Sequence, residues 1–368
     1  MRNSLRSSTR LLVVAALCAV VAILVGACGS SSNSSSSSGS GASGASSSSA
    51  SKKVSSGHFT IAYGEPAAVD EVTNRNVQAM QWAAKQLGWT LKYTNAQGNI
   101  SLLNQTLTNE VNQGISGIVV GSTDANLIRP ALLAAKQANI PAIVIGGGVP
   151  SSPLYAATIT EDEALMSKLL TQYMVKDLGG SGDIAAINIS QLSSGIQRSQ
   201  ARDAVLKGTG VKIVAQADGD LANPIKGTQQ IAADIIAKHP NIKAIWLVYD
   251  YMIGPTVTAL KQAHLNGKVK LYSWFAGPQN VSLLRDNTTG VRALVEDNFD
   301  HTALVAMDTL AGKLAAHKAI NPNPLVAEPM HYEVVTTKNA PPPGTLLFPI
   351  AKNEAPFAAK WAQGQFGP

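Results

Sequence analysis

Charged and aromatic side chains follow several short apolar segments, at positions where they could bind a small polar molecule. Arg198 follows Ser193, Ser194 and Gly195, and its guanidinium offers a rigid fork of donors that suits paired hydroxyl groups. Asp250 can accept two hydroxyl donors at once, whereas Tyr249 can stack on a ring or donate one bond. Other candidates for direct contact are Asp70, Glu71, Trp274 and Phe275.

The residue types that carry catalysis or bind metals do not occur at the spacings these functions need. Asp218 and Asp220 begin a possible calcium loop, but Asn223 stands where that loop needs glycine and Gln229 where it needs a bidentate glutamate. We find no phosphate-binding loop and no Gly-x-Ser-x-Gly turn around a nucleophile. The sequence therefore predicts a protein without metal, cofactor or enzymatic activity. The histidines are scattered, at His58, His239, His264, His301, His317 and His331.

The elements that must position these side chains alternate between short apolar runs and longer amphipathic stretches, which predicts parallel strands joined by crossover helices. In such sheets ligands bind beyond the carboxyl ends of the strands, where most of the candidates lie. The predicted strands are 59–63, 90–93, 117–120, 142–145, 183–189, 212–217, 244–248 and 270–274. The predicted helices are 74–87, 102–113, 128–138, 163–177, 196–206, 225–238 and 254–263.

The first residues are typical of an export signal, residues 1–27. Three arginines precede an uncharged apolar run, 11–25, that is short for a membrane span of about 20 residues. Val25-Gly26-Ala27-Cys28 resembles the bacterial lipobox, which predicts that Cys28 is lipidated and becomes the first mature residue. An uncleaved anchor and cleavage without lipidation are the alternatives. Cys18 lies in the signal, so a mature chain can form no internal disulfide.

Residues 28–57 are predicted to be a tether. They are almost wholly Ser, Gly and Ala, which offer too little apolar surface to offset the entropy of ordering. The formal charge of +6 falls to +3 without the three signal arginines. With no basic stripe, nucleic acid is excluded as the expected partner.

Four segments carry a family resemblance: 59–63, 85–89, 112–120 and 135–144. Three further segments, 225–230, 237–245 and 259–264, extend it. Together they resemble the ribose-type, or type I, periplasmic binding proteins, which are substrate-binding proteins of sugar ABC transporters. The similarity runs from about His58 to Thr337.

The resemblance implies an α/β fold with two Rossmann-like lobes, each a parallel sheet flanked by helices. A three-strand hinge, near 157–161, 296–298 and 325–328, joins the lobes, and the ligand cleft lies between them. The N-terminal lobe is expected at 58–157 plus 298–326, and the C-terminal lobe at 158–297 plus 327–340. A Pro-rich tail, 341–368, extends past the family's usual end, and Pro341, Pro342 and Pro343 predict a stiff extended segment across the lobes.

The resemblance also suggests roles for the candidates. Arg198 matches the cleft arginine that binds sugar oxygens, with Arg202 one turn further on as the fallback. Asp297 aligns with a polar cleft residue on the second crossover, although a hinge salt bridge is an alternative role. Trp274 or Phe275 would pack on a sugar ring, or stay in the core. Asp70 and Glu71 could instead cap the helix that follows, and Tyr251 could lie at the lip of the site.

The sequence departs from the family's pattern at three places, of which the glycine triplet puts ribose itself in doubt. Gly146, Gly147 and Gly148 replace the family's usual Asp-Arg pair and offer only backbone groups. Ala276 replaces the cleft aspartate, and Gly219 replaces a frequent phenylalanine, which predicts a wider pocket.

The resemblance thus implies a monomeric, extracytoplasmic lipoprotein that is anchored to the outer face of the cytoplasmic membrane, or is periplasmic. It would capture a sugar or polyol and deliver it to the permease subunits of an ABC importer. The alternatives are a sensory lipoprotein that presents its ligand to a membrane receptor, and a binding protein for a non-sugar solute. A transcription regulator and an exported hydrolase fit less well, since an export signal replaces the helix-turn-helix and no catalytic motif is found.

Overall fold

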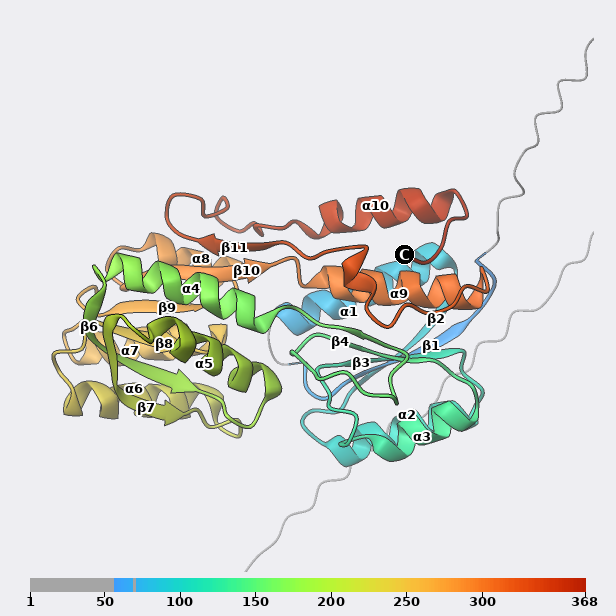
Figure 1. Cartoon of the computed structure of the whole chain (residues 1–368), viewed down its shortest axis with the longest axis horizontal. Coiled ribbons are helices and arrows are strands. Elements are labelled where there is room, and N and C mark those ends of the chain that lie inside the picture. The colour runs from blue at the N-terminus through green and yellow to red at the C-terminus, as the bar shows by residue number, and fades with distance from the viewer. Residues whose placement is uncertain (1–55, 69–70) are drawn as a thin grey trace, which may run out of the picture. The chain divides into compact units, whose positions relative to one another are not determined.

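The computed structural model describes residues 56–68 and 71–368 (Figure 1). The predicted signal peptide, Cys28, Asp70 and all of the predicted tether except Ser56 and Gly57 lie outside the described residues. Within the described ranges, no helix combines the length and apolar character needed to cross a bilayer.

One sheet has five parallel strands in the order β2, β1, β3, β4, β5. Its side chains alternate between two cores, so Ile61 and Tyr63 pack in the core with α1 and α9, whereas Ala62 packs in the core with α2 and α3. Helices α1 and α9 lie on one side of the sheet, and α2 and α3 lie on the other (Figure 1). We call this sheet and its four helices the first lobe. Its elements are β1 Thr60–Glu65, α1 Glu71–Leu87, β2 Thr90–Asn95, α2 Ile100–Asn112, β3 Gly117–Gly121, α3 Arg129–Gln137, β4 Ala142–Ile145, β5 Ala157–Ile159 and α9 Asp300–Leu314.

The other sheet has six strands in the order β11, β10, β9, β8, β6, β7, and it is parallel except that β11 is antiparallel to β10. Helix α4 packs on α5 and on β10, while α6 packs on α7. We call this sheet and α4 to α8 the second lobe. Its elements are α4 Glu163–Asp177, β6 Ser181–Asn188, α5 Ser193–Leu206, β7 Gly210–Asp218, α6 Pro224–Lys238, β8 Ala244–Leu247, the 3-10 turn η1 Asp250–Met252, α7 Ile253–Gln262, β9 Lys270–Trp274, α8 Pro278–Arg285, β10 Val291–Asp297 and β11 Tyr332–Val335.

Local chemistry sets several of the boundaries. Asn99 and Asp162 accept backbone hydrogen bonds at the starts of α2 and α4. Pro224 and Pro278 occupy the first turns of α6 and α8, where the missing N–H has no intrahelical acceptor. Gly88, which follows α1, adopts a positive φ of 71° that reverses the chain into β2.

The chain passes between the lobes four times. It leaves the first lobe after β5, returns after β10, enters the second lobe again through the 3-10 turn η2 (Pro324–Val326) to β11, and finally returns to α10 (Ile350–Ala362). Helix α10 packs on α1 and α9. The tail therefore differs from the predicted extended segment at 350–362, where Phe357 and Trp361, one helical turn apart, are buried in the first lobe despite Pro356 inside the helix.

Candidate ligand-binding site

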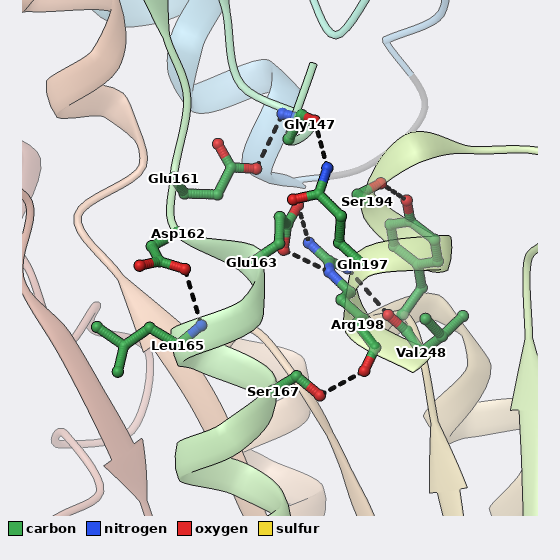
Figure 2. Close-up of polar contacts among 12 residues, drawn as sticks. Gly147, Glu161, Asp162, Glu163, Leu165, Ser167, Ser194, Gln197, Arg198 and Val248 are labelled. Carbon is green, nitrogen blue, oxygen red and sulfur yellow. Dashed lines mark hydrogen bonds and ion pairs between the residues drawn. The ribbon is translucent and has the colours of Figure 1, made fainter. Parts of the chain in front are cut away.

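Arg198 lies on α5 where the two lobes meet, and it is 2% exposed. Its Nε and Nη2 donate to the two carboxylate oxygens of Glu163 at 2.6 and 3.0 Å, and its Nη1 donates to the Val248 carbonyl at 2.9 Å (Figure 2). Burial lowers the pKa of Arg198, but the facing carboxylate of Glu163 and the other nearby groups raise it. The net shift of the pKa is upward, so the guanidinium stays charged. These bonds use three of its five N–H groups, so most of the fork is occupied by the protein itself.

Three aromatic rings surround this guanidinium. The Arg198 Cζ lies 3.9 Å from the Trp274 ring centre, 4.6 Å from that of Tyr249 and 5.4 Å from that of Phe275. Trp274 is fully buried behind the arginine, and Phe275 lies between Trp274 and Phe299. Both rings thus pack around the Arg198 guanidinium and do not present an exposed face on which a sugar ring could stack.

Tyr249 and Asp250 follow β8 at the edge of the same group. The Tyr249 hydroxyl forms a hydrogen bond with Ser194 Oγ at 2.5 Å, and burial raises the pKa of Tyr249 to about 12. The ring of Tyr249 stacks on that of Tyr251 at 5.8 Å. Because of this raised pKa, the hydroxyl of Tyr249 remains a neutral donor or acceptor at neutral pH. Asp250 begins the turn η1 and is half-buried.

Glu161, Glu163 and Asp297 form a cluster of buried carboxyl groups at the junction of the lobes. Glu161 Oε1 accepts from the Gly147 N–H at 2.9 Å (Figure 2). Both oxygens of Asp297 and, when Glu161 is ionised, its Oε2 have no hydrogen-bond partner, whereas a protonated Glu161 can bond to the Glu163 carboxyl. Burial, followed by the neighbouring carboxylates, raises the pKa of Glu161 and of Asp297 well above the ordinary values. Such unpartnered buried oxygens are rare unless a proton or a ligand satisfies them.

Sequence reasoning did not single out Glu161 or Glu163. A signal was present, since Glu161, Asp162 and Glu163 form an acidic run at the end of the predicted first crossover. Their role depends on contacts with α5 and with the glycine loop, which lie far away in the sequence.

The glycine triplet of the first lobe presses its backbone against the second lobe. Gly146, Gly147 and Gly148 have φ values of 69°, 72° and 57°. A Cβ on Gly148 would come within 2.8 Å of Glu163 Cγ, and Gln197 donates to the Gly148 carbonyl at 2.5 Å. Only glycine permits this approach.

A second ion-pair group links α1 to the end of β10. Arg75 donates to Glu296 at 3.1 Å and to Asp300 at 2.5 Å, and all three side chains are buried. Glu71, at the exposed start of α1, places its carboxylate against Gly277 of the second lobe. The structure thus brings Arg198, Tyr249, Trp274, Phe275 and Asp297 together, whereas Glu71 lies at another point of contact between the lobes.

The structure does not support two of the predictions made from the sequence, the wide pocket at Gly219 and the alternative role of Arg202. The space at Gly219 is not wide, because a Cβ there would come within 2.9 Å of both Ile189 and Met252. Arg202 donates to Asn188 at 2.7 Å and lies over Trp246, inside the second lobe, so it takes no part in the group around Arg198.

A cavity of about 510 Å³ lies elsewhere, on the first lobe, between α3 and residues 150–154. Asp124, Arg129 and Lys136 line it, and none of the predicted contact residues does. Among the described residues, no group of His, Cys, Asp and Glu side chains is placed to hold a metal ion.

Comparison with known proteins gives consistent matches. The sequence model of a family described as periplasmic binding protein domain matches residues 66–318. The galactofuranose-binding protein YtfQ of Escherichia coli is 28% identical over 50% of this chain and 59% of its own length. A xylitol-binding protein of Mycolicibacterium smegmatis is 27% identical over 40% of this chain and 41% of its own length. The curated relatives are thus matched over less than two thirds of their lengths.

Solved structures share the fold. An ABC sugar transporter subunit from Rhodobacter sphaeroides superposes with a TM-score of 0.69 and 20% identity, covering 76% of this chain and 99% of its own. A galactofuranose binding protein gives the same TM-score and identity over 83% of this chain and 99% of its own. This likeness supports a common architecture of two lobes.

Proposed function

The chain belongs to the periplasmic binding protein family, and we propose that it captures a small polar solute, a sugar or polyol, outside the cytoplasmic membrane for delivery to an ABC importer. The names of the relatives support this class of solute, since they are binding proteins for galactofuranose, ribose or allose, and xylitol.

The main support for this proposal is the environment of the Asp297 side chain. Its side chain is fully buried at the junction of the lobes, and neither carboxylate oxygen has a partner. A carboxylate can accept two hydroxyl donors at once, which is the pattern that adjacent hydroxyls of a sugar present. Glu161 Oε2 adds a third acceptor close by, since the charges of Glu161 and Asp297 influence each other.

Direct contacts between the lobes support capture by closure. Gln197 of the second lobe binds the Gly148 carbonyl of the first, and Arg75 of α1 binds Glu296 of β10. Because the lobes are joined by crossing segments, a hinge movement that makes and breaks such contacts would trap and release a solute.

The proposed location of the protein outside the cytoplasmic membrane is inferred from its first residues. Val25 to Cys28, preceded by a short apolar run and three arginines, supports an exported lipoprotein that is held by lipid on Cys28 and acts as a monomer beside the permease. Mass spectrometry of the chain extracted from membranes is expected to give a protein that begins at Cys28 and carries lipid on it. A chain that keeps its signal, or an unmodified Cys28, contradicts the lipid anchor.

The solute can be identified by melting curves of the full chain in detergent, measured with pentoses, hexoses, disaccharides, polyols, nucleosides and amino acids. A ligand that binds only the folded state at 100 times its Kd adds about 2.7 kcal/mol of stability. We expect a shift with one group of sugars or polyols. A shift only with nucleosides or amino acids contradicts the sugar proposal. Growth on the solute after gene deletion then distinguishes uptake from sensing.

A further inference from the structure

The buried charges at the junction do not balance. Glu161, Glu163 and Asp297 face one guanidinium, Arg198, and Glu163 already occupies that guanidinium with both of its oxygens. The other nearby cation, Arg75, is itself shared between Glu296 and Asp300. When ionised, Asp297 and Glu161 therefore have no cation of their own.

Three carboxylate oxygens at this junction are both buried and unpartnered. They are Oδ1 and Oδ2 of Asp297 and Oε2 of Glu161, in side chains that are 0% and 4% exposed. A buried carboxylate without a counter-charge is strongly unfavourable, so without ligand it tends to keep its proton. The raised pKa values of both groups agree with this.

A neutral polyol would supply hydrogen-bond donors to these oxygens but no compensating charge. An ammonium group supplies both, because it has three N–H donors, no acceptor and a positive charge. A metal ion is the other cation that could serve, but the described residues include no group of side chains placed to hold one.

We infer that the solute carries an ammonium group among its hydroxyls, as in an amino sugar or an amino polyol, and that Asp297 and Glu161 bind that group. This inference rests on the proposed function, which supplies the hydroxyl-bearing remainder of the solute. Neutral solutes would then bind more weakly, and acidic sugars or sugar phosphates would be rejected.

The test is titration calorimetry of the full chain with matched pairs that differ by one amine: glucosamine with glucose, galactosamine with galactose, and 1-amino-1-deoxysorbitol with sorbitol. In the pair that binds, the amine should bind at least about tenfold tighter than its neutral partner. In a Glu161→Gln variant this ratio should fall toward one. Asp286→Asn, an exposed carboxylate on the second lobe, is the control and should leave the ratio unchanged.

The affinity for the amine should also rise with pH above the ordinary carboxyl range and through the raised pKa values of Glu161 and Asp297, because binding favours the ionised carboxylates and releases their protons. Groups that influence Glu161 or Asp297 across the junction are Glu163, Arg198, Arg75, Glu296, Tyr249 and Tyr332. Of these, the arginines stay charged and the tyrosines neutral over that range.

Three results would contradict the inference. Equal or tighter binding of the neutral partner overturns the inference and leaves the proposed function standing. A larger stabilisation by calcium or magnesium chloride alone than by any amine also overturns it. If no sugar, polyol or amine binds, the proposed function fails and the inference fails with it.

Discussion

The two lobes contribute different chemistry to their junction. The second lobe provides Arg198, its aromatic walls and, with the adjoining crossovers, the carboxylates Glu163 and Asp297. The first lobe provides chiefly the backbone of the glycine loop at 146–148. We infer from this difference that the second lobe and the crossovers supply most of the contacts to the proposed solute, and that the first lobe supplies a closing surface.

Glu163→Ala should destabilise the second lobe most, because it leaves Arg198 charged and buried without its carboxylate. Breaking a buried pair in this way costs about 3–5 kcal/mol. Unfolding in guanidinium chloride measures the loss. A double variant, Glu163→Leu with Arg198→Met, should recover most of the stability, and an unrecovered loss would mean that the pair itself is not the cause.

Gly148→Ala tests the first lobe as a closing surface. Its Cβ would approach Glu163 and the Gln197 amide within 2.9 Å, at a φ of 57°. We expect solute affinity to fall at least about tenfold, since strain of this kind costs about 1–3 kcal/mol. Gly254→Ala is the matched control, because nothing lies within 4 Å of its Cβ and its φ is not positive. Equal effects of the two changes would contradict the role of the loop.

The unliganded chain should lose stability as the pH rises through the range in which Asp297 and Glu161 ionise. Their folded pKa values are raised, so the contribution of the protonated carboxyls to stability is fully present below the unfolded pKa values of about 4, and it is lost progressively as the pH rises from there through the raised folded values. Each unit of raised pKa corresponds to about 1.4 kcal/mol. Melting temperatures from about pH 4 to pH 8 should fall less steeply in an Asp297→Asn, Glu161→Gln variant. Parallel curves would contradict the proton account.

Gln197→Ala should have the smallest effect. It removes one hydrogen bond between the lobes, to the Gly148 carbonyl, which is worth about 1 kcal/mol. Stopped-flow measurements should show faster release of solute with little change in its association rate. Gln229→Ala, which removes one hydrogen bond to Gln262 from a half-buried position on α6 within the second lobe, provides the control.

Much of the architecture could be predicted from the sequence, because apolar periodicity and turn residues are local signals. The strands 142–145 and 270–274 and the helix 163–177 begin and end where they were expected. Helix α10 was missed because the preceding prolines dominate the composition, whereas Phe357 and Trp361 stabilise it through contacts with α1 and α9.

The site was less predictable, because its chemistry depends on partners that are distant in the sequence. Arg198 was singled out, but its pairing with Glu163 requires α4 and α5 to lie side by side. Trp274 could be assigned to a sugar platform or to the core from its position after a strand, and only packing against Trp246 and Arg198 decides for the core.

Calorimetry of Asp297→Asn with the solute found in the melting screen tests whether this buried carboxylate binds the solute. Because neither oxygen of Asp297 is bonded within the protein, the variant should fold with unchanged or higher stability at neutral pH. We predict that its affinity for the solute falls by about 100-fold, which corresponds to about 2.7 kcal/mol. An affinity equal to that of the unaltered chain would contradict the assignment of this junction as the binding site.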